Sequence, residues 1–155
     1  MSSKFLLQSF FKNEPAFSTD FAVLSAPVRH MFINGTLWHL NKQGVKNPAI
    51  LEVGAWFGAS TLTFAKAVES YFESKGSITS IDAWQPFFNK DENKGDVYNF
   101  MEAALSTDVA YDVYRYNVST MPESINCQHF RAKSGIALPL MCQDHFDVVY
   151  IDGDH

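Results

Sequence analysis

The sequence feature that most constrains the fold is the run AILEVGAWFGAST at residues 49–61, together with the segment that follows it. Its first part, AILEVG, is a short apolar stretch that ends in glycine, which is typical of a buried parallel strand. Residues 60–76 then place apolar side chains on one helical stripe, and SITSID at residues 77–82 supplies a second strand. This order predicts a β-α-β unit with a right-handed crossover and a parallel sheet.

The remaining segments extend this unit to a larger sheet. Residues 1–46 mix short apolar clusters with Pro and Gly, and they predict a helical lead-in. The further predicted elements are helices at residues 96–106 and 109–119 and strands at residues 125–135 and 146–152. The sequence therefore predicts an α/β fold with a Rossmann-like, doubly wound, mostly parallel sheet over residues 47–155, which stops after its fourth strand.

The charge and hydropathy of the chain exclude two classes of partner. Seventeen acidic residues stand against twelve basic ones, for a net charge of -5, and no cluster of Lys and Arg occurs. The positive field that attracts a phosphate backbone is therefore missing, so we expect no nucleic-acid partner. No run of 18 apolar residues occurs either, so we expect no membrane span and a cytoplasmic protein.

The loop after the first strand has the chemistry of a ligand site. Gly54 and Gly58 are four residues apart, unlike the G-x-G-x-x-G spacing of dinucleotide enzymes, and Glu52 precedes them. A carboxylate at this point opposes a phosphate and favours a cationic ligand such as S-adenosylmethionine, which carries a sulfonium and an ammonium group. Asp82, at the carboxyl end of the second strand, is placed to accept hydrogen bonds from ribose hydroxyls. Together these residues predict one nucleoside site.

Plainer interpretations of the same residues remain open. A glycine turn can be purely structural, Asp82 can cap the next turn, and Trp84 belongs either to an adenine pocket or to the core. A nicotinamide-dependent dehydrogenase is a further alternative, disfavoured by the glycine spacing and by Glu52.

Four segments together resemble the successive motifs of class I S-adenosylmethionine-dependent methyltransferases: ILEVGAWFGAST, SITSIDAW, HFRAKSG and FDVVYIDGDH. The IDGDH ending is similar to that of bacterial sugar and small-molecule O-methyltransferases, and the likeness covers residues 48–155. It implies methyl transfer from S-adenosylmethionine to a hydroxyl of a small-molecule acceptor. The cofactor residues that it implies are Glu52, Gly54, Gly58 and Ser60 for the methionine portion, Asp82 for the ribose, and Lys133 and Ser134 for the adenine edge.

The last strand delivers three polar residues to the same edge of the sheet. An imidazole has a pKa suited to taking a proton from a hydroxyl near neutral pH, so His155 is the first candidate for a catalytic base and Asp154 the second. In relatives that use Mg²⁺, the acid that matches Asp152 is a metal ligand, and Asp152 is therefore a candidate metal ligand here. The other ligands of such sites come from a later strand that this sequence does not include.

A sheet that stops after its fourth strand leaves an edge uncovered. We consider three explanations: the sequence is a fragment, a second copy covers the edge in a homo-oligomer, or the protein is a degenerate relative. The last explanation gives an alternative function, a catalytically incomplete nucleoside-binding or assembly module on the same half-fold. The sequence does not choose among them.

Overall fold

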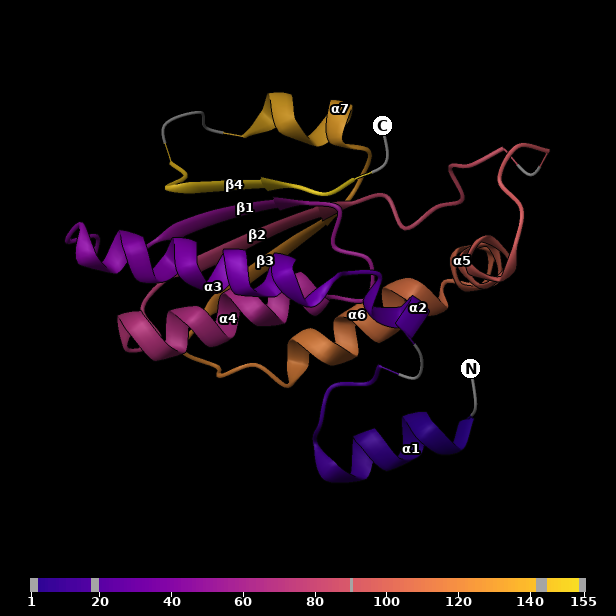
Figure 1. Cartoon of the computed structure of the whole chain (residues 1–155), viewed down its shortest axis with the longest axis horizontal. Helices are drawn as coiled ribbons and strands as arrows, with labels where there is room; N and C mark the ends of the chain where they lie inside the picture. Colours follow the sequence, from indigo (N-terminus) through magenta and orange to yellow (C-terminus); the bar gives the residue numbers. More distant parts are fainter. Residues whose placement is uncertain (1–2, 18–19, 90, 142–144, 154–155) are drawn as a thin grey trace.

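The computed structural model describes residues 3–17, 20–89, 91–141 and 145–153, and Figure 1 shows the whole chain. The helices are α1 (Ser3–Lys12), α2 (Asp20–Val23), α3 (Pro27–Lys42), α4 (Ala59–Phe72), α5 (Asp96–Ser106), α6 (Val109–Ser119) and α7 (Ser134–Ala137), which continues into a 3-10 turn at Leu138–Leu140. The strands are β1 (Ala49–Val53), β2 (Ser77–Asp82), β3 (Asn126–Arg131) and β4 (Val148–Ile151).

The four strands form one parallel sheet in the order β3-β2-β1-β4. Ile50 of β1 pairs in register with Ile78 of β2 and with Val148 of β4, and β2 pairs in the same sense with β3. This arrangement confirms the Rossmann-like α/β fold. Because all four strands run the same way, their carboxyl ends meet at one edge of the sheet, on the right in Figure 1.

Alternate residues of β1 explain how both faces of the sheet are covered. Ile50 is fully buried in a core shared with Phe64 and Val68 of α4. Leu51 belongs to a smaller core on the opposite face, which includes Ala137 of α7. Successive side chains of a strand point to opposite faces, so an apolar run with both parities buried requires a helix layer on each side.

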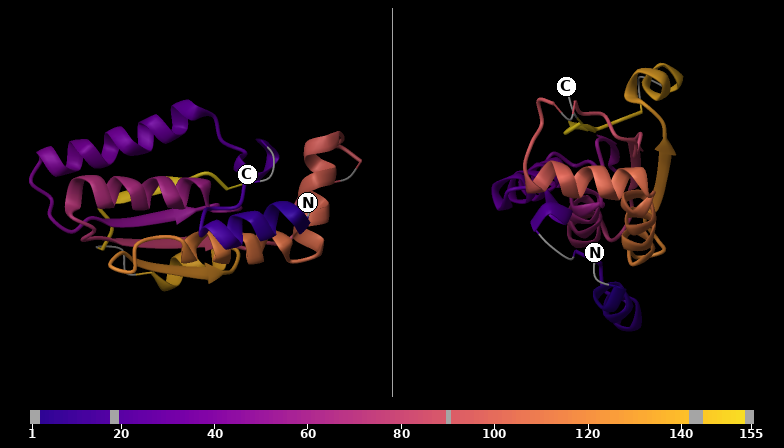
Figure 2. Two further views of the ribbon diagram at one scale, coloured as in Figure 1. Left: turned by 90° about the horizontal axis from the view of Figure 1, so that it is seen from below. Right: turned by 90° about the vertical axis from the view of Figure 1, so that its right-hand side faces the viewer.

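The lead-in helices belong to the α4 side of the molecule. Figure 2 shows α3 running beside α4, and the buried face of α3 consists of Ile33 and Leu37, which share a core with Phe64. Pro27 occupies the first turn of α3, where its missing N–H costs nothing. The helix α1 lies farthest from the sheet, next to α6 (Figure 2).

A third, aromatic core lies near the carboxyl edge, between the lead-in segment and the helices α5 and α6. Trp84 is 1% exposed and its ring centre lies 4.6 Å from that of Tyr114. The Trp84 indole N–H donates to the carbonyl oxygen of Trp56 at 2.7 Å. Trp84 is therefore a core residue, and the interpretation of this side chain as part of an adenine pocket has no support.

The strand β4 forms one edge of the sheet, as the sequence predicts for a sheet of four strands. Val149 and Ile151 are 56% and 61% exposed, so one face of this edge strand is uncovered in the described part of the chain.

No helix in the described part of the chain is both long enough and apolar enough to cross a membrane.

The turn after β1 depends on a close approach between two loops. Gly54 has a φ of +89°, and a Cβ built on it would lie 2.5 Å from the carbonyl oxygen of Asp152. The Gly54 N–H donates to the carbonyl oxygen of Ile81 at 2.8 Å. Only glycine satisfies both the left-handed backbone and this contact.

We therefore expect Gly54→Ala to lower the free energy of unfolding by about 2–4 kcal/mol, because the methyl group would force the two loops apart. Urea denaturation measures this change. Gly35→Ala is the matched control, because Gly35 lies within α3 and a Cβ there meets no atom within 4 Å. It should stabilise the protein by about 0.5–1 kcal/mol. Equal effects of the two substitutions would contradict the close approach.

Candidate functional site

The carboxylate of Asp82 organises the carboxyl edge of the sheet. Its Oδ2 accepts hydrogen bonds from the backbone N–H groups of Ala55 at 2.9 Å and Trp56 at 3.0 Å. Its Oδ1 accepts one from the N–H of Trp84 at 2.7 Å. Trp56 has a φ of +50°, an unfavourable conformation for a residue with a large side chain. Asp82 thus holds the turn after β1 and the turn after β2 in one arrangement.

A side chain of α6 also holds the turn after β1 in place. The side-chain amide of Asn117, which is fully buried, donates to the carbonyl oxygen of Phe57 at 2.8 Å. The carbonyl oxygen of the same amide accepts from the N–H of Ala16 at 2.6 Å. The Trp56 and Phe57 rings stack with their centres 4.6 Å apart. The turn is therefore rigid on the side that faces the core.

The carboxyl group of Glu52 lies in the layer between the sheet and α4 and is fully buried. It accepts hydrogen bonds from the hydroxyls of Ser60 and Thr61 at 2.5 Å and of Ser80 at 2.7 Å. Burial raises the pKa of Glu52 above its ordinary value of 4.5, although the three hydrogen bonds act in the opposite direction.

This burial corrects the expectation for the charge of Glu52 and bears on that for Ser60. Glu52 was expected to present a negative charge to a ligand, yet its carboxyl group points into the protein and bonds to hydroxyls there. Ser60 was expected to hold the methionine portion, and its hydroxyl donates to Glu52. Its role toward a ligand stays a prediction. The physical reason for the burial of Glu52 is the two-residue period of the strand, since Glu52 shares the face of Ile50, which α4 covers.

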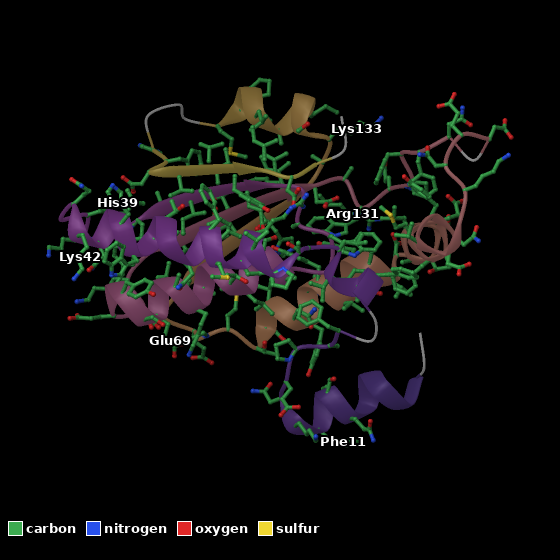
Figure 3. The ribbon with its side chains drawn as sticks, viewed as in Figure 1. Phe11, His39, Lys42, Glu69, Arg131 and Lys133 are labelled. Atoms are coloured by element: carbon green, nitrogen blue, oxygen red, sulfur yellow. The ribbon has the colours of Figure 1, made fainter. Side chains whose placement is uncertain are left out.

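The carboxyl end of β3 lies beside Asp82. The N–H of Ala132 donates to the carbonyl oxygen of Asp82 at 2.9 Å. Lys133 and Ser134 follow at the start of α7, and both are exposed. Figure 3 shows Arg131 and Lys133 at this end of the sheet. The structure therefore brings Gly54, Asp82 and residues 133–134 to one edge, while their roles toward a ligand remain predictions.

At the end of β4, Asp152 is paired with an arginine of the lead-in segment. The Nη1 of Arg29 donates to both carboxylate oxygens, at 2.7 and 2.8 Å, and the hydroxyl of Tyr150 donates to Oδ2 at 3.0 Å. Arg29 was not predicted, because a lone basic residue two positions after Pro27 carries no signal of a contact 123 residues away. Asp154 and His155 lie outside the described residues.

The surroundings of Asp152 give no support to a bound Mg²⁺. Within the described ranges, no group of three or more His, Cys, Asp or Glu side chains comes together in a way that could hold a metal ion. The Asp152 carboxylate is occupied by a guanidinium, which repels a divalent cation.

Two hollows of the surface lie along α4. One, of about 390 Å³, lies between α3 and α4 and is lined in part by His30, Leu62 and Thr63. The other, of about 430 Å³, lies between α4 and the segment after α6 and is lined in part by Lys66 and Met121. Neither hollow includes the residues that the sequence assigns to the cofactor.

Two comparisons with known proteins found matches. A family model described as a methyltransferase domain matches residues 51–155. Among solved structures, the chain is similar to the apo structure of a TDP-rhamnose 3'-O-methyltransferase, an enzyme in calicheamicin biosynthesis, with 15% identity and a TM-score of 0.40. That match covers 95% of this chain and 63% of the TDP-rhamnose methyltransferase chain. This chain therefore spans less than two thirds of the length of that enzyme. No curated protein matches the chain by sequence.

The buried carboxyl group of Glu52 should make the stability of the protein depend on pH. Because its pKa is raised in the folded state, the native protein holds this proton more tightly than the unfolded chain does. The contribution of Glu52 to stability is therefore present in acid and is lost as the pH rises from about 4.5 toward the raised pKa. The largest possible slope is about 1.4 kcal/mol per pH unit.

We expect Glu52→Gln to remove this dependence, so the variant gains stability relative to the wild type as the pH rises through that window. Urea denaturation of both proteins at several pH values gives the difference, in which the titration of other groups cancels. Glu92→Gln, at an exposed position, controls for the loss of one negative charge. A difference between E52Q and wild type that does not change with pH would show that the pKa is not raised.

Proposed function

Since the chain belongs to the methyltransferase domain family, we propose that it binds S-adenosylmethionine at the carboxyl edge of its sheet and methylates a hydroxyl of a small-molecule or sugar acceptor. The observation that carries this proposal is the position of Asp82 between the glycine turn after β1 and the end of β3. An acid at this point of an open parallel sheet is where such folds bind the ribose of a nucleoside.

The hydrogen-bonding capacity of Asp82 fits a ribose. Each carboxylate oxygen can accept about two hydrogen bonds. The Oδ2 of Asp82 accepts two from backbone N–H groups, whereas its Oδ1 accepts one, from Trp84. Oδ1 therefore keeps capacity for a hydroxyl group of a ligand. Asp82 is also only partly buried, so this oxygen lies within reach of a ligand at the edge of the sheet.

The remaining groups of the edge would bind the rest of the cofactor. Lys133 and Ser134 are exposed next to Asp82 and are our candidates for the adenine edge. The turn at Gly54–Gly58 is our candidate for the methionine portion, through its backbone rather than through the Glu52 carboxylate. The bound cofactor supplies an electrophilic methyl group, and the contribution of this chain is to hold that group and the acceptor in line.

We propose that the acceptor hydroxyl binds at the end of β4. A hydroxyl that attacks a methyl group loses its proton, and an imidazole is suited to take it near neutral pH. We therefore propose His155 as the base and Asp154 as the second candidate, on the sequence analysis alone.

Calorimetric titration with S-adenosylmethionine and S-adenosylhomocysteine tests the cofactor site. We expect saturable binding by the wild type and a loss of about tenfold or more in Asp82→Asn, because the amide cannot accept as many hydrogen bonds. Asp91→Asn, at an exposed position, is the matched control and should bind as the wild type does.

A second variant separates binding from folding, because Asp82→Asn also loosens the turn after β1. Lys133→Ala changes an exposed side chain of the same site and should weaken binding without a change in the unfolding midpoint. Absence of binding by the folded wild type would refute the cofactor proposal. Saturable binding without methyl transfer to any hydroxyl acceptor would instead favour the catalytically incomplete module.

A further inference from the structure

Arg29 brings a fixed positive charge to the carboxyl end of β4. Its Nη1 lies 2.7 Å from Oδ1 and 2.8 Å from Oδ2 of Asp152, and the Tyr150 hydroxyl adds a third hydrogen bond to the same carboxylate. Charge-assisted hydrogen bonds of this kind are stronger than bonds between neutral groups. The Asp152 carboxylate therefore accepts hydrogen bonds from side chains of two elements, Arg29 of α3 and Tyr150 of β4.

The position of Arg29 is set by a packed helix. Ile33 and Leu37, on the same helix, are buried against α4. The next residue, His30, has its Nδ1 2.7 Å from the Thr63 hydroxyl of α4. The N-terminal halves of α3 and α4 are thus joined by a polar contact as well as by their core. A guanidinium delivered by such a helix is held near its partner, unlike one at the end of a mobile loop.

The neighbouring acids are engaged in other ways. The Glu52 carboxyl group is buried and bonded to three hydroxyls, and the Asp82 carboxylate accepts three backbone N–H groups. Asp152 is thus the one acid of these three whose charge is balanced by a cationic side chain in the described structure. A divalent ion at Asp152 would have to displace Arg29 or bind beside it, and repulsion opposes the second arrangement.

We propose that Arg29 takes, at Asp152, the place that a divalent metal ion takes at the matching acid of metal-using methyltransferases, so that this site does not recruit Mg²⁺. The proposal rests on the proposed function for its meaning in catalysis. Both bonds to Asp152 use one of the three nitrogens of the guanidinium, whose fork has five N–H donors in all. Arg29 is thus a positioning residue that orients the Asp152 carboxylate and balances its charge.

Binding of Mn²⁺, followed by electron paramagnetic resonance of the free ion, tests the proposal without any need for catalysis. We expect wild type and Asp152→Asn to bind Mn²⁺ equally weakly. We expect Arg29→Gln to bind it about fivefold or more tightly, because a repulsive charge is gone and a carboxylate is released. The gain should disappear in the double variant R29Q/D152N.

Two further variants control for side effects. Arg29→Lys keeps the charge and should resemble the wild type, whereas Lys42→Gln removes a positive charge from the far end of the same helix and should not strengthen Mn²⁺ binding. Unfolding midpoints show that each variant is folded.

Two results would overturn the proposal: Mn²⁺ binding by the wild type that Asp152→Asn weakens, or no gain in Arg29→Gln. Titration of the same proteins with S-adenosylmethionine keeps the proposed function separate. Failure of the wild type to bind it would refute that function and leave the Mn²⁺ result to be judged by itself.

Discussion

The hydrogen bonds of the Asp82 carboxylate are the interaction on which the carboxyl edge of this sheet depends. The turn after β1 contains three residues with positive φ, Gly54, Trp56 and Gly58, and such a turn does not hold its shape unaided. The Asp82 carboxylate accepts hydrogen bonds from two N–H groups of that turn and from the N–H of Trp84 in the turn after β2. The residue that we propose to bind a ribose is therefore also the residue that shapes this edge of the sheet, so a substitution of Asp82 would change ligand affinity and local stability together.

Glu52 performs a comparable task one layer deeper. Its carboxyl group joins β1, β2 and the first turn of α4 through three hydroxyl donors. A charge at this depth is costly, which is why burial dominates the three hydrogen bonds and the pKa rises. Of the three acids at this edge, Glu52 is buried and Asp152 is paired with Arg29, which leaves Asp82 as the one that is partly exposed and has no cationic partner in the described structure. The site is more nearly neutral than its sequence implies.

The secondary structure could be predicted because its signals are local. The runs 49–53 and 77–82 and the periodic helices between 96 and 119 needed only neighbouring residues to be identified. The burial of Glu52 was also available in principle, because it lies two residues after Ile50 and therefore on the face that α4 covers. The pairs Arg29–Asp152 and Ala16–Asn117 could not be predicted from the sequence. They join residues more than a hundred positions apart, and no periodic pattern encodes them.

These distant pairs change how the lead-in segment is understood. Residues 1–46 were predicted as a region preceding the cofactor domain, yet α3 shares a core with α4, and Ala16 is bonded to the same buried Asn117 that holds the turn after β1. Arg29 then reaches the last described strand. A movement of α3 away from α4 would therefore withdraw the positive charge of Arg29 from Asp152. The glycine turn is supported by an earlier part of the lead-in segment, through Ala16 and Asn117. The lead-in segment thus contacts both the end of β4, through Arg29, and the turn after β1, through the carbonyl oxygen of Phe21, which accepts from the indole N–H of Trp56.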